Sequence, residues 1–355
     1  MISLREKFAH IKFNKKSKVA LLTHTDMDGS GSSILLRHFF GKNLILVKYF
    51  TNYGMDKGIK DTVENETLME SIDVLFITDI SCSIETAIYI ANSKYANKII
   101  LLDHHPTAKK LNAFPFAYVE EEVKDASFDH LIYKEKLHTY DGSITTSGTT
   151  LMLDFLISKG FYPKSKLVLE LAHTIGAYDS WSWSKVFDNA KEYSNLNTLF
   201  AIYEQEKFEK VFVKKLKKGE KTLFGKTENL LLELEESKIE NYVSTKSKLF
   251  ETFYISIDER NYFAIFANVD RYYSNIFDKM MELYPNAELL IANNSGKISL
   301  RTRKDDVNVS EIAQKVGGGG HVQAAGFSMF EENKFAFFSA FETKLGAKIS
   351  FIEKN

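Results

Sequence analysis

Four short apolar runs near the start of the chain constrain its fold most strongly. They are KVALLTH (18–24), NLILVKYF (43–50), DVLFITDIS (73–81) and KIILLDHH (98–105). Each is rich in leucine or β-branched residues and is followed by a helix-length amphipathic segment, which is the pattern of buried parallel strands joined by helical crossovers. We therefore expect an α/β N-terminal domain built on a doubly wound parallel sheet. In such sheets, ligands bind outside the carboxyl ends of the strands.

Acids and histidines follow three of these runs at the point where each strand would end. They are His24, Asp26 and Asp28 after the first run, Asp79 in the third, and Asp103, His104 and His105 in the fourth. A later helical segment, ELAHTIGAYDSW (170–181), adds Asp179. Because the carboxyl ends of parallel strands meet at one edge of a sheet, we expect these side chains to gather along one rim.

The types of these side chains indicate which metal the rim would bind. Carboxylate oxygens and imidazoles without a thiolate suit manganese, magnesium or iron better than structural zinc. Two such ions about 3.5–4 Å apart can activate water and stabilise both the attacking and the leaving oxygen of a phosphoryl group. The sequence therefore predicts a two-ion site for phosphoester hydrolysis.

The middle of the chain, from about residue 190 to 250, is rich in lysine and glutamate with helical spacing, and Gly219 and Gly225 mark a break in it. We interpret 191–250 as a charged helical linker between a domain at 1–190 and a smaller α/β domain at 251–355. Expected strands of the second domain are YFAIFANV (262–269), AELLIANN (287–294) and KISLRTR (297–303).

Four consecutive glycines precede His321 in the second domain. Such a run costs chain entropy, which indicates close backbone approach to a ligand or a nest of N–H groups that binds an anion. Arginines on the adjoining strand can bind phosphate bidentately. We predict a site that grips the phosphate of a substrate, formed by Arg301, Arg303, Gly318, Gly319, Gly320 and His321.

Composition excludes several classes of protein. The 46 basic residues nearly balance the 47 acidic ones, which argues against a scaffold that coats long nucleic acid. The single cysteine, Cys82, excludes an internal disulfide framework and a multi-cysteine zinc site. Charges throughout the first 22 residues and the lack of a membrane-length apolar run predict a soluble, cytoplasmic protein without membrane partners.

Five motifs together resemble the DHH superfamily of phosphoesterases with a C-terminal DHHA1 domain. The motifs are HTDMDG (24–29), TDIS (78–81), LDHHPT (102–107), AYDSW (177–181) and GGGGHVQAAG (317–326). Their combination is most similar to the NrnB-type nanoRNase branch, whose members degrade oligoribonucleotides a few residues long. The resemblance spans nearly the whole chain. It implies a catalytic, metal-binding DHH domain and a substrate-binding DHHA1 domain.

The resemblance also implies roles for individual residues. Metal ligands would be Asp26, Asp28, Asp79, His104 and Asp179. Asp103 and His105 would orient ligands or contact the phosphate in catalysis, and Arg301 with the glycine segment and His321 would hold the far end of the substrate.

Two residues keep alternative roles. His24 lies two residues before the first aspartate, whereas many relatives place a ligand histidine four residues before it. It could be a ligand, a phosphate contact or a group that orients a ligand. Ser147, in TTSGTT (145–150), either touches substrate or simply caps a helix.

The activity that the resemblance implies is that of a phosphodiesterase, an exonuclease of short RNA that releases nucleoside monophosphates with two Mn²⁺ ions, or with Mg²⁺ or another divalent ion. Alternatives are a phosphoesterase of cyclic dinucleotides or of 3′-phosphoadenosine 5′-phosphate, and a non-catalytic nucleotide-binding module. The polarity of cleavage, the preferred length and the choice between RNA and DNA stay open, as does a homodimer.

Overall fold

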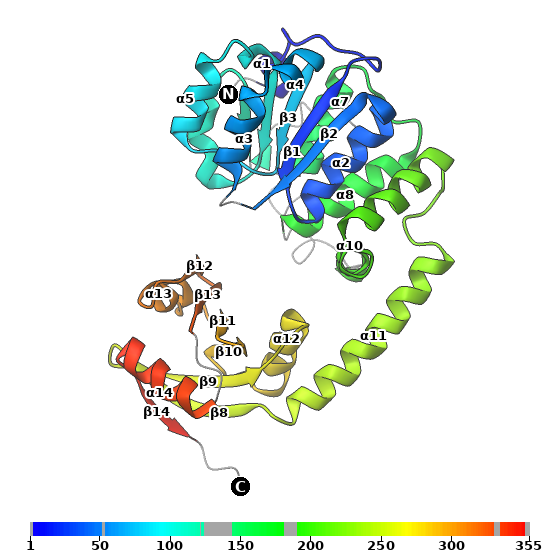
Figure 1. Cartoon of the computed structure of the whole chain (residues 1–355). Helices are drawn as coiled ribbons and strands as arrows, with labels where there is room; N and C mark the ends of the chain where they lie inside the picture. The colour runs from blue at the N-terminus through cyan, green and yellow to red at the C-terminus, as the bar shows by residue number, and fades with distance from the viewer. Residues whose placement is uncertain are drawn as a thin grey trace. The chain divides into compact units, whose positions relative to one another are not determined.

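The computed structural model describes residues 3–51, 54–120, 122–123, 144–180, 190–329 and 334–351. The chain forms two compact units, Met1–Leu232 and Glu233–Asn355, and each is described by itself (Figure 1). Among the described residues, no helix is both long and apolar enough to span a membrane.

The first unit is built on a five-stranded parallel sheet in the order β2-β1-β3-β4-β5. Its strands are β1 (Val19–His24), β2 (Leu44–Phe50), β3 (Val74–Thr78), β4 (Ile99–Asp103) and β5 (Ala117–Val119). Short elements complete the unit: α1 (Leu4–Lys7), η1 (Gly41–Asn43), η2 (Ala96–Lys98), η3 (Pro106–Ala113), β6 (Glu122–Val123) and β7 (Ile144–Thr145). The predicted doubly wound parallel sheet is confirmed.

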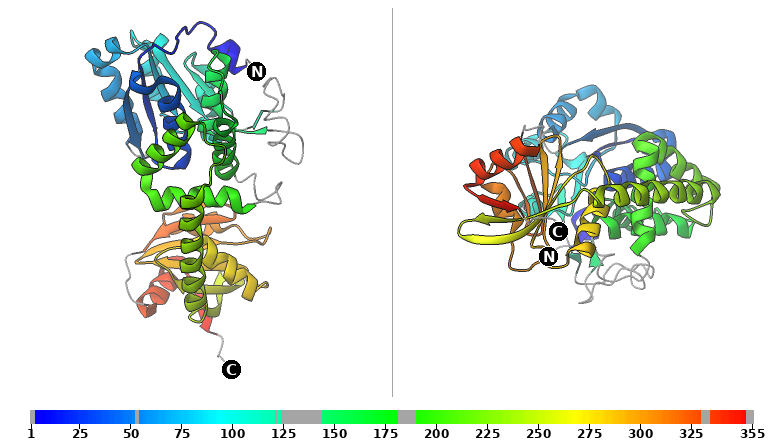
Figure 2. Two further views of the ribbon diagram at one scale, coloured as in Figure 1. Left: turned by 90° about the vertical axis from the view of Figure 1, so that its right-hand side faces the viewer. Right: turned by 90° about the horizontal axis from the view of Figure 1, so that it is seen from below.

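Helices cover both faces of this sheet (Figures 1 and 2). Alternate residues of a strand point to opposite faces, so Leu21 of β1 enters one core and Leu22 enters the other. The first core lies under α2 (Met27–Phe40), α7 (Gly148–Ser158) and α8 (Lys166–Asp179). The second lies under α3 (Met55–Glu64), α4 (Glu66–Ser71) and α5 (Ile84–Asn92). Burial on both faces explains why β1, β3 and β4 are apolar without alternation.

Strand β2 differs from our expectation of a buried strand. All seven of its residues are at least partly exposed, and Ile45 is 41% exposed. The reason is its place at the edge of the sheet, where it pairs only with β1. An apolar run alone does not distinguish an edge strand from a central one.

The helical middle of the chain consists of α10 (Ala190–Lys218) and α11 (Lys226–Ser247), with Gly219 and Gly225 between them as expected. Helix α10 is more than a solvated connector, because it contributes six side chains to the first core. These are Leu196, Leu199, Tyr203, Phe208, Phe212 and Leu216. Exposed lysines between them, including Lys207, Lys210 and Lys214, lie on the outer face, which is why the sequence follows the pattern of a charged spacer.

The second unit is a seven-stranded mixed sheet in the order β12-β13-β11-β10-β9-β8-β14. Its strands are β8 (Glu251–Ile257), β9 (Arg260–Asn268), β10 (Leu289–Asn294), β11 (Lys297–Arg301), β12 (Gly319–His321), β13 (Ala324–Ser328) and β14 (Lys348–Phe351). Helix α12 (Tyr273–Leu283) packs on one face, and α13 (Val309–Gln314) and α14 (Lys334–Leu345) pack on the other. The predicted α/β class of this unit is confirmed.

Part of the glycine run, which we predicted to approach a ligand or to form an anion-binding nest, is a strand. Gly319, Gly320 and His321 form β12, which pairs with β13. A side chain on Gly318 would lie 2.2 Å from the carbonyl oxygen of Gly326, and Gly320 has a φ of +142°. Close packing against β13 therefore explains part of the run. Gly319 differs, because a Cβ atom there would meet nothing within 4 Å among the described residues.

The packing of α10 predicts a large loss of stability for Phe212→Ala. Phe212 is fully buried, so its truncation should lower the free energy of unfolding by about 3–5 kcal/mol. Urea unfolding of the first unit would measure this loss. The matched variant Leu230→Ala removes a side chain that is 56% exposed and should cost less than about 1 kcal/mol. Equal, small losses would show that α10 is not part of the core.

Candidate metal centre

The turn from β1 to α2 supplies the first acids of the site. Asp26 is the N-cap of α2, and its carboxylate accepts a hydrogen bond from the Gly29 amide at 3.0 Å. Its other oxygen lies 2.6 Å from Nδ1 of His24, the last residue of β1. The same His24 nitrogen is 4.0 Å from the carboxylate of Asp79. His24 thus lies beside two of the predicted ligands.

Asp28, in the first turn of α2, is held by the start of α7. Its two carboxylate oxygens accept hydrogen bonds from the amides of Gly148 at 2.6 Å and Thr149 at 3.0 Å. The Thr149 hydroxyl donates to the Asp28 carbonyl oxygen at 2.7 Å. Two backbone amides at a helix start thereby fix a buried carboxylate in one orientation.

Ser147 is the N-cap of α7 and forms a capping box with Thr150. Its hydroxyl accepts a hydrogen bond from the Thr150 amide at 3.2 Å, and the residue is fully buried. The structure therefore accounts for the helix-capping role, while a contact between Ser147 and substrate stays a prediction.

Asp79 follows β3 directly and has a left-handed backbone conformation with a φ of 58°. Such a conformation is uncommon outside glycine and costs about 1–3 kcal/mol. Gly148 lies so close that an added Cβ atom would be 2.5 Å from Cβ of Asp79. The strained backbone turns the Asp79 carboxylate toward the other acids, and the glycine leaves room for it.

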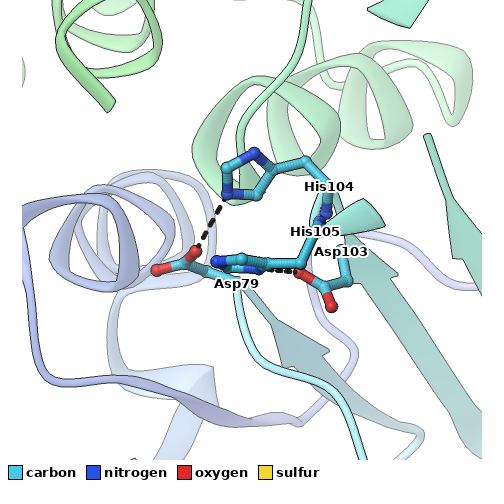
Figure 3. A group of neighbouring side chains, drawn as sticks. All are labelled: Asp79, Asp103, His104 and His105. Atoms are coloured by element: carbon cyan, nitrogen blue, oxygen red, sulfur yellow. Dashed lines mark hydrogen bonds and ion pairs between the residues drawn. The ribbon is translucent and has the colours of Figure 1, made fainter. Parts of the chain in front are cut away.

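The end of β4 contributes Asp103 and the two histidines. One oxygen of the fully buried Asp103 accepts from the amide of His104 at 2.8 Å and lies 2.7 Å from Nδ1 of His105. His104 points the other way, with its Nε2 atom 3.4 Å from Asp79 and 3.1 Å from Asp179, the last residue of α8. Figure 3 shows the His105 ring between Asp103 and Asp79.

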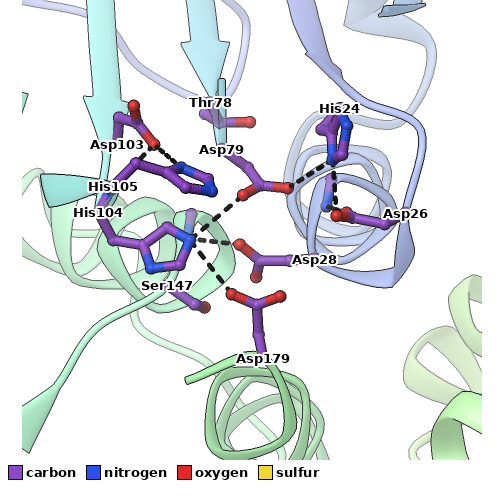
Figure 4. Close-up of polar contacts among 12 residues, drawn as sticks. His24, Asp26, Asp28, Thr78, Asp79, Asp103, His104, His105, Ser147 and Asp179 are labelled. Carbon is purple, nitrogen blue, oxygen red and sulfur yellow. Dashed lines mark hydrogen bonds and ion pairs between the residues drawn. The ribbon is translucent and has the colours of Figure 1, made fainter. Parts of the chain in front are cut away.

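The structure thus brings all eight predicted rim residues together (Figure 4). Their ligand atoms form three overlapping groups, each with all atoms within 4.8 Å of one another. Asp79 belongs to all three groups. The groups are Asp79 with Asp103, His104 and His105; Asp28 with Asp79, His104 and Asp179; and His24 with Asp26 and Asp79.

The electrostatics of the cluster are unfavourable for carboxylates alone. Burial and the neighbouring carboxylates Asp28 and Asp26 raise the pKa of Asp79, and the same causes raise the pKa of Asp179. Burial also opposes ionisation of Asp26, but hydrogen bonds from His24 and Gly29 outweigh it and lower the Asp26 pKa to about 2. Burial lowers the pKa of His104.

The two other histidines gain protons more readily. The hydrogen bond with Asp26 raises the pKa of His24, and the hydrogen bond with Asp103 raises that of His105 to about 9. In both cases the histidine is stabilised as a cation by an adjacent carboxylate.

The donor set fits divalent cations. One oxygen of Asp79 and one oxygen of Asp103 are buried without a hydrogen-bond partner. Nε2 of His104 is buried beside the carboxylates of Asp79 and Asp179 but forms no hydrogen bond with them. Among the described residues, no lysine or arginine forms an ion pair with Asp28, Asp79 or Asp179. Buried, like-charged carboxylates with open coordination positions are stabilised by a cation, and oxygen with imidazole donors suits Mn²⁺ or Mg²⁺.

The helix-start motif singled out in the sequence, Ser147 to Thr150, includes Gly148 and Thr149, but the sequence did not predict that their amides hold the Asp28 carboxylate. Helix-start motifs are common in proteins. This contact could have been predicted only if the position of the Asp28 side chain opposite the start of α7 had been known.

The residues predicted to hold substrate lie in the second unit. Arg301 ends β11 and donates to the Leu300 carbonyl at 2.9 Å, with its guanidinium 5.3 Å from the Phe277 ring centroid. Burial lowers its pKa. Through the strand pairing, Arg301, Ala324 and His321 lie in one row across β11, β13 and β12. Arg303, beyond the end of β11, pairs instead with Asp278 at 3.1 Å.

Comparison with known proteins places this geometry in a family. Residues 18–172 match the model of the DHH family, N-terminal domain, and residues 273–347 match that of the DHHA1 domain. The oligoribonuclease NrnB of Bacillus subtilis (strain 168) is 28% identical over 316 residues, which cover 88% of this chain and 73% of the relative.

Solved structures share the fold at low identity. RecJ from Thermus thermophilus, crystallised with Mn²⁺, matches with a TM-score of 0.52 and 14% identity, over 96% of this chain and 54% of RecJ. PggH, a pGpG-specific phosphodiesterase from Vibrio cholerae, matches with a TM-score of 0.50 and 14% identity, over 93% of this chain and 99% of PggH. With both domain models matched in order and the acidic rim assembled, the chain belongs to the DHH/DHHA1 family of phosphoesterases.

Proposed function

We propose that this protein is a manganese-dependent phosphodiesterase that hydrolyses short oligoribonucleotides to nucleoside monophosphates. The observation that carries the proposal is the cluster of buried carboxylates around Asp79, which lacks any paired lysine or arginine among the described residues. The similarity to oligoribonuclease NrnB, at 28% identity, supports short RNA as the substrate class.

The proposed ligands of two cations are His24, Asp26, Asp28, Asp79, His104 and Asp179. Asp79, which is shared by the groups around His24 and around His104, is suited to bridge the two positions. Divalent ions, when bound, lower the pKa of water and offset negative charge on a phosphoryl group. The amides of Gly148 and Thr149 keep the Asp28 carboxylate in place for this role.

Asp103 and His105 would act together on the phosphate. The Asp103 carboxylate holds Nδ1 of His105, which leaves Nε2 as the nitrogen free to contact substrate. The His105 side chain is half exposed, so a ligand at the rim can reach it. We therefore assign to His105 a contact with a phosphoryl oxygen and to Asp103 the orientation of that histidine.

The second unit would bind the rest of the substrate. No carboxylate among the described residues pairs with the partly buried Arg301, which leaves its charge available to a phosphate. The residues of β13 that pair with these strands are small, with Ala324 next to Arg301 and with Gly326 between Ser299 and Gly319. Gly319 has open space around its Cα atom, which would let a ligand approach the backbone. The backbone of His321 lies in the same row as Arg301.

The direct test is hydrolysis of a 5′-labelled diribonucleotide by the purified protein with Mn²⁺. We expect release of mononucleotide, and less turnover of cyclic dinucleotides and 3′-phosphoadenosine 5′-phosphate at equal concentration. If the protein hydrolyses one of the other compounds faster than the diribonucleotide, that compound and not short RNA is the substrate. Binding of all of them without turnover would favour the non-catalytic module.

The role of Arg301 predicts a loss that depends on the substrate. A charge-assisted hydrogen bond to phosphate contributes about 1.5–3 kcal/mol. Arg301→Ala should therefore lower kcat/KM on diribonucleotides by roughly 10- to 150-fold. Hydrolysis of bis(p-nitrophenyl) phosphate, which has no second nucleoside to hold, should change little.

Lys297→Ala is the matched control, since this exposed residue begins the same strand β11 and should not affect either substrate. Equal losses on both substrates in Arg301→Ala would show that the arginine serves the metal centre or the fold.

A further inference from the structure

A group of unpaired lysines gathers at the edge of the first unit that is opposite the metal centre. We define the lysine patch as Lys15, Lys16, Lys42, Lys214, Lys217 and Lys218. All six are exposed. Within the part of the chain that the structure describes, none of the six forms an ion pair with an acid. The protein has a net charge of only −1, so this is a local concentration of positive charge.

The packing of α10 along α2 brings the patch together. Gln205 donates to Ser30 at 3.2 Å, and Ser33 donates to Glu209 at 2.9 Å. The helical conformation of α10 is interrupted at Glu204, which has a φ of 58° and a ψ of 160°. The part of α10 after this break therefore runs in the same direction as α2, and both end at the same side of the unit. Helix α2 begins at the metal centre with Asp26 and is 14 residues long, so its far end lies about 20 Å away along the helix axis.

Three segments that are distant in sequence meet there. Burial lowers the pKa of His38, in the last turn of α2, and the nearby charges of Lys217 and Lys15 lower this pKa further. Asn43, next to Lys42, donates a hydrogen bond to the carbonyl oxygen of Lys15 at 3.0 Å. Lys214, Lys217 and Lys218 share one face of α10, because residues three and four apart are neighbours on a helix.

Stabilisation of helix ends does not explain the whole patch. Lysines in the last turn of α10 complement the partial negative charge of the helix terminus, and this applies to Lys217 and Lys218. Lys15 and Lys16 lie in the segment before β1, outside any helix, where such an effect does not apply. Like charges on one surface repel one another and so destabilise the folded protein, and a bound anion would offset this repulsion.

The chemistry of the patch indicates the class of partner. Protein-binding surfaces are depleted in lysine and enriched in aromatic residues, and membrane-surface helices add large apolar side chains to their lysines. A surface with several exposed, unpaired lysines suits a flexible chain of phosphates, which binds through charge rather than shape.

We propose that the lysine patch binds the phosphate backbone of single-stranded RNA longer than the hydrolysed substrate, as an auxiliary site separate from the metal centre. The choice of RNA rests on the proposed function. The site would keep longer RNA, whose degradation products are the short substrates, close to the enzyme.

The test is fluorescence anisotropy of a labelled 20-residue oligouridylate with the full-length protein in EDTA, over a series of KCl concentrations. Lys214→Gln, Lys217→Gln and Lys218→Gln are combined in the patch variant. The control variant combines Lys297→Gln, Lys344→Gln and Lys348→Gln, which removes the same charge from exposed lysines of the second unit.

We expect the patch variant to weaken RNA binding at least about 10-fold at 50 mM KCl and to lower the slope of log K against log salt by about 2, since each phosphate contact on a single strand contributes about 0.7. The control variant should bind like the original protein, and both variants should hydrolyse diribonucleotide at the original rate.

The proposal is overturned if the patch variant binds RNA like the original protein or if the control variant loses as much. Binding of the original protein to phosphatidylglycerol vesicles in a patch-dependent way, without binding to RNA, would also overturn it in favour of a lipid surface. Because EDTA prevents metal-dependent hydrolysis, the result does not depend on whether short RNA is the substrate.

Discussion

The contact between the start of α7 and the turn after β3 is the constraint on which the metal centre depends. Gly148 lies against the strained backbone of Asp79, and its amide, with that of Thr149, holds the carboxylate of Asp28. This contact brings two buried acids side by side, with Asp179 and His104 across from them. The arrangement costs electrostatic and backbone energy in the protein alone. A divalent cation would offset the electrostatic part, so stability and catalysis depend on the same contact.

Much of the metal centre could be predicted because its position at the edge of the sheet does not depend on the order of the strands. Asp79 and Asp103 follow or end apolar strands, and any parallel sheet gathers such residues at one edge. The orientation of each side chain could not be predicted in this way. His104 and His105 are adjacent, yet one faces Asp179 and the other faces Asp103, because the chain leaves β4 at that point.

The sequence was less informative where buried apolar residues alternate with charged ones. Phe208 and Phe212 are in the first core, but the charged residues around them, such as Lys207 and Lys210, follow the pattern of a solvated helix. Likewise, the glycines after α13 indicated close approach of a ligand, and the structure shows that Gly318 and Gly320 are required in part by close packing against β13. In both cases the deciding contact is made by a segment that no local pattern identifies.

Charge in the first unit is separated along α2. Acids gather at the helix start beside Asp26, and unpaired lysines gather beyond its end near His38. A balanced total charge therefore conceals two regions with opposite preferences, one for cations and one for polyanions. The second unit adds Arg301, which no acid among the described residues neutralises and to which the proposed function assigns a phosphate of the substrate. Assigning metal, substrate and longer RNA to separate surfaces accounts for all three.

Counting bound Mn²⁺ in Asp79→Asn tests the central claim most directly. Asparagine tolerates the left-handed backbone and has the size of aspartate, so the fold should be retained while one charge is lost. By equilibrium dialysis we expect two tightly bound ions per chain in the original protein and in Asp73→Asn, which changes an exposed acid at the other end of β3. We expect fewer in Asp79→Asn. The account is contradicted if the original protein binds no Mn²⁺, or if Asp79→Asn binds as many ions as Asp73→Asn with the same affinity.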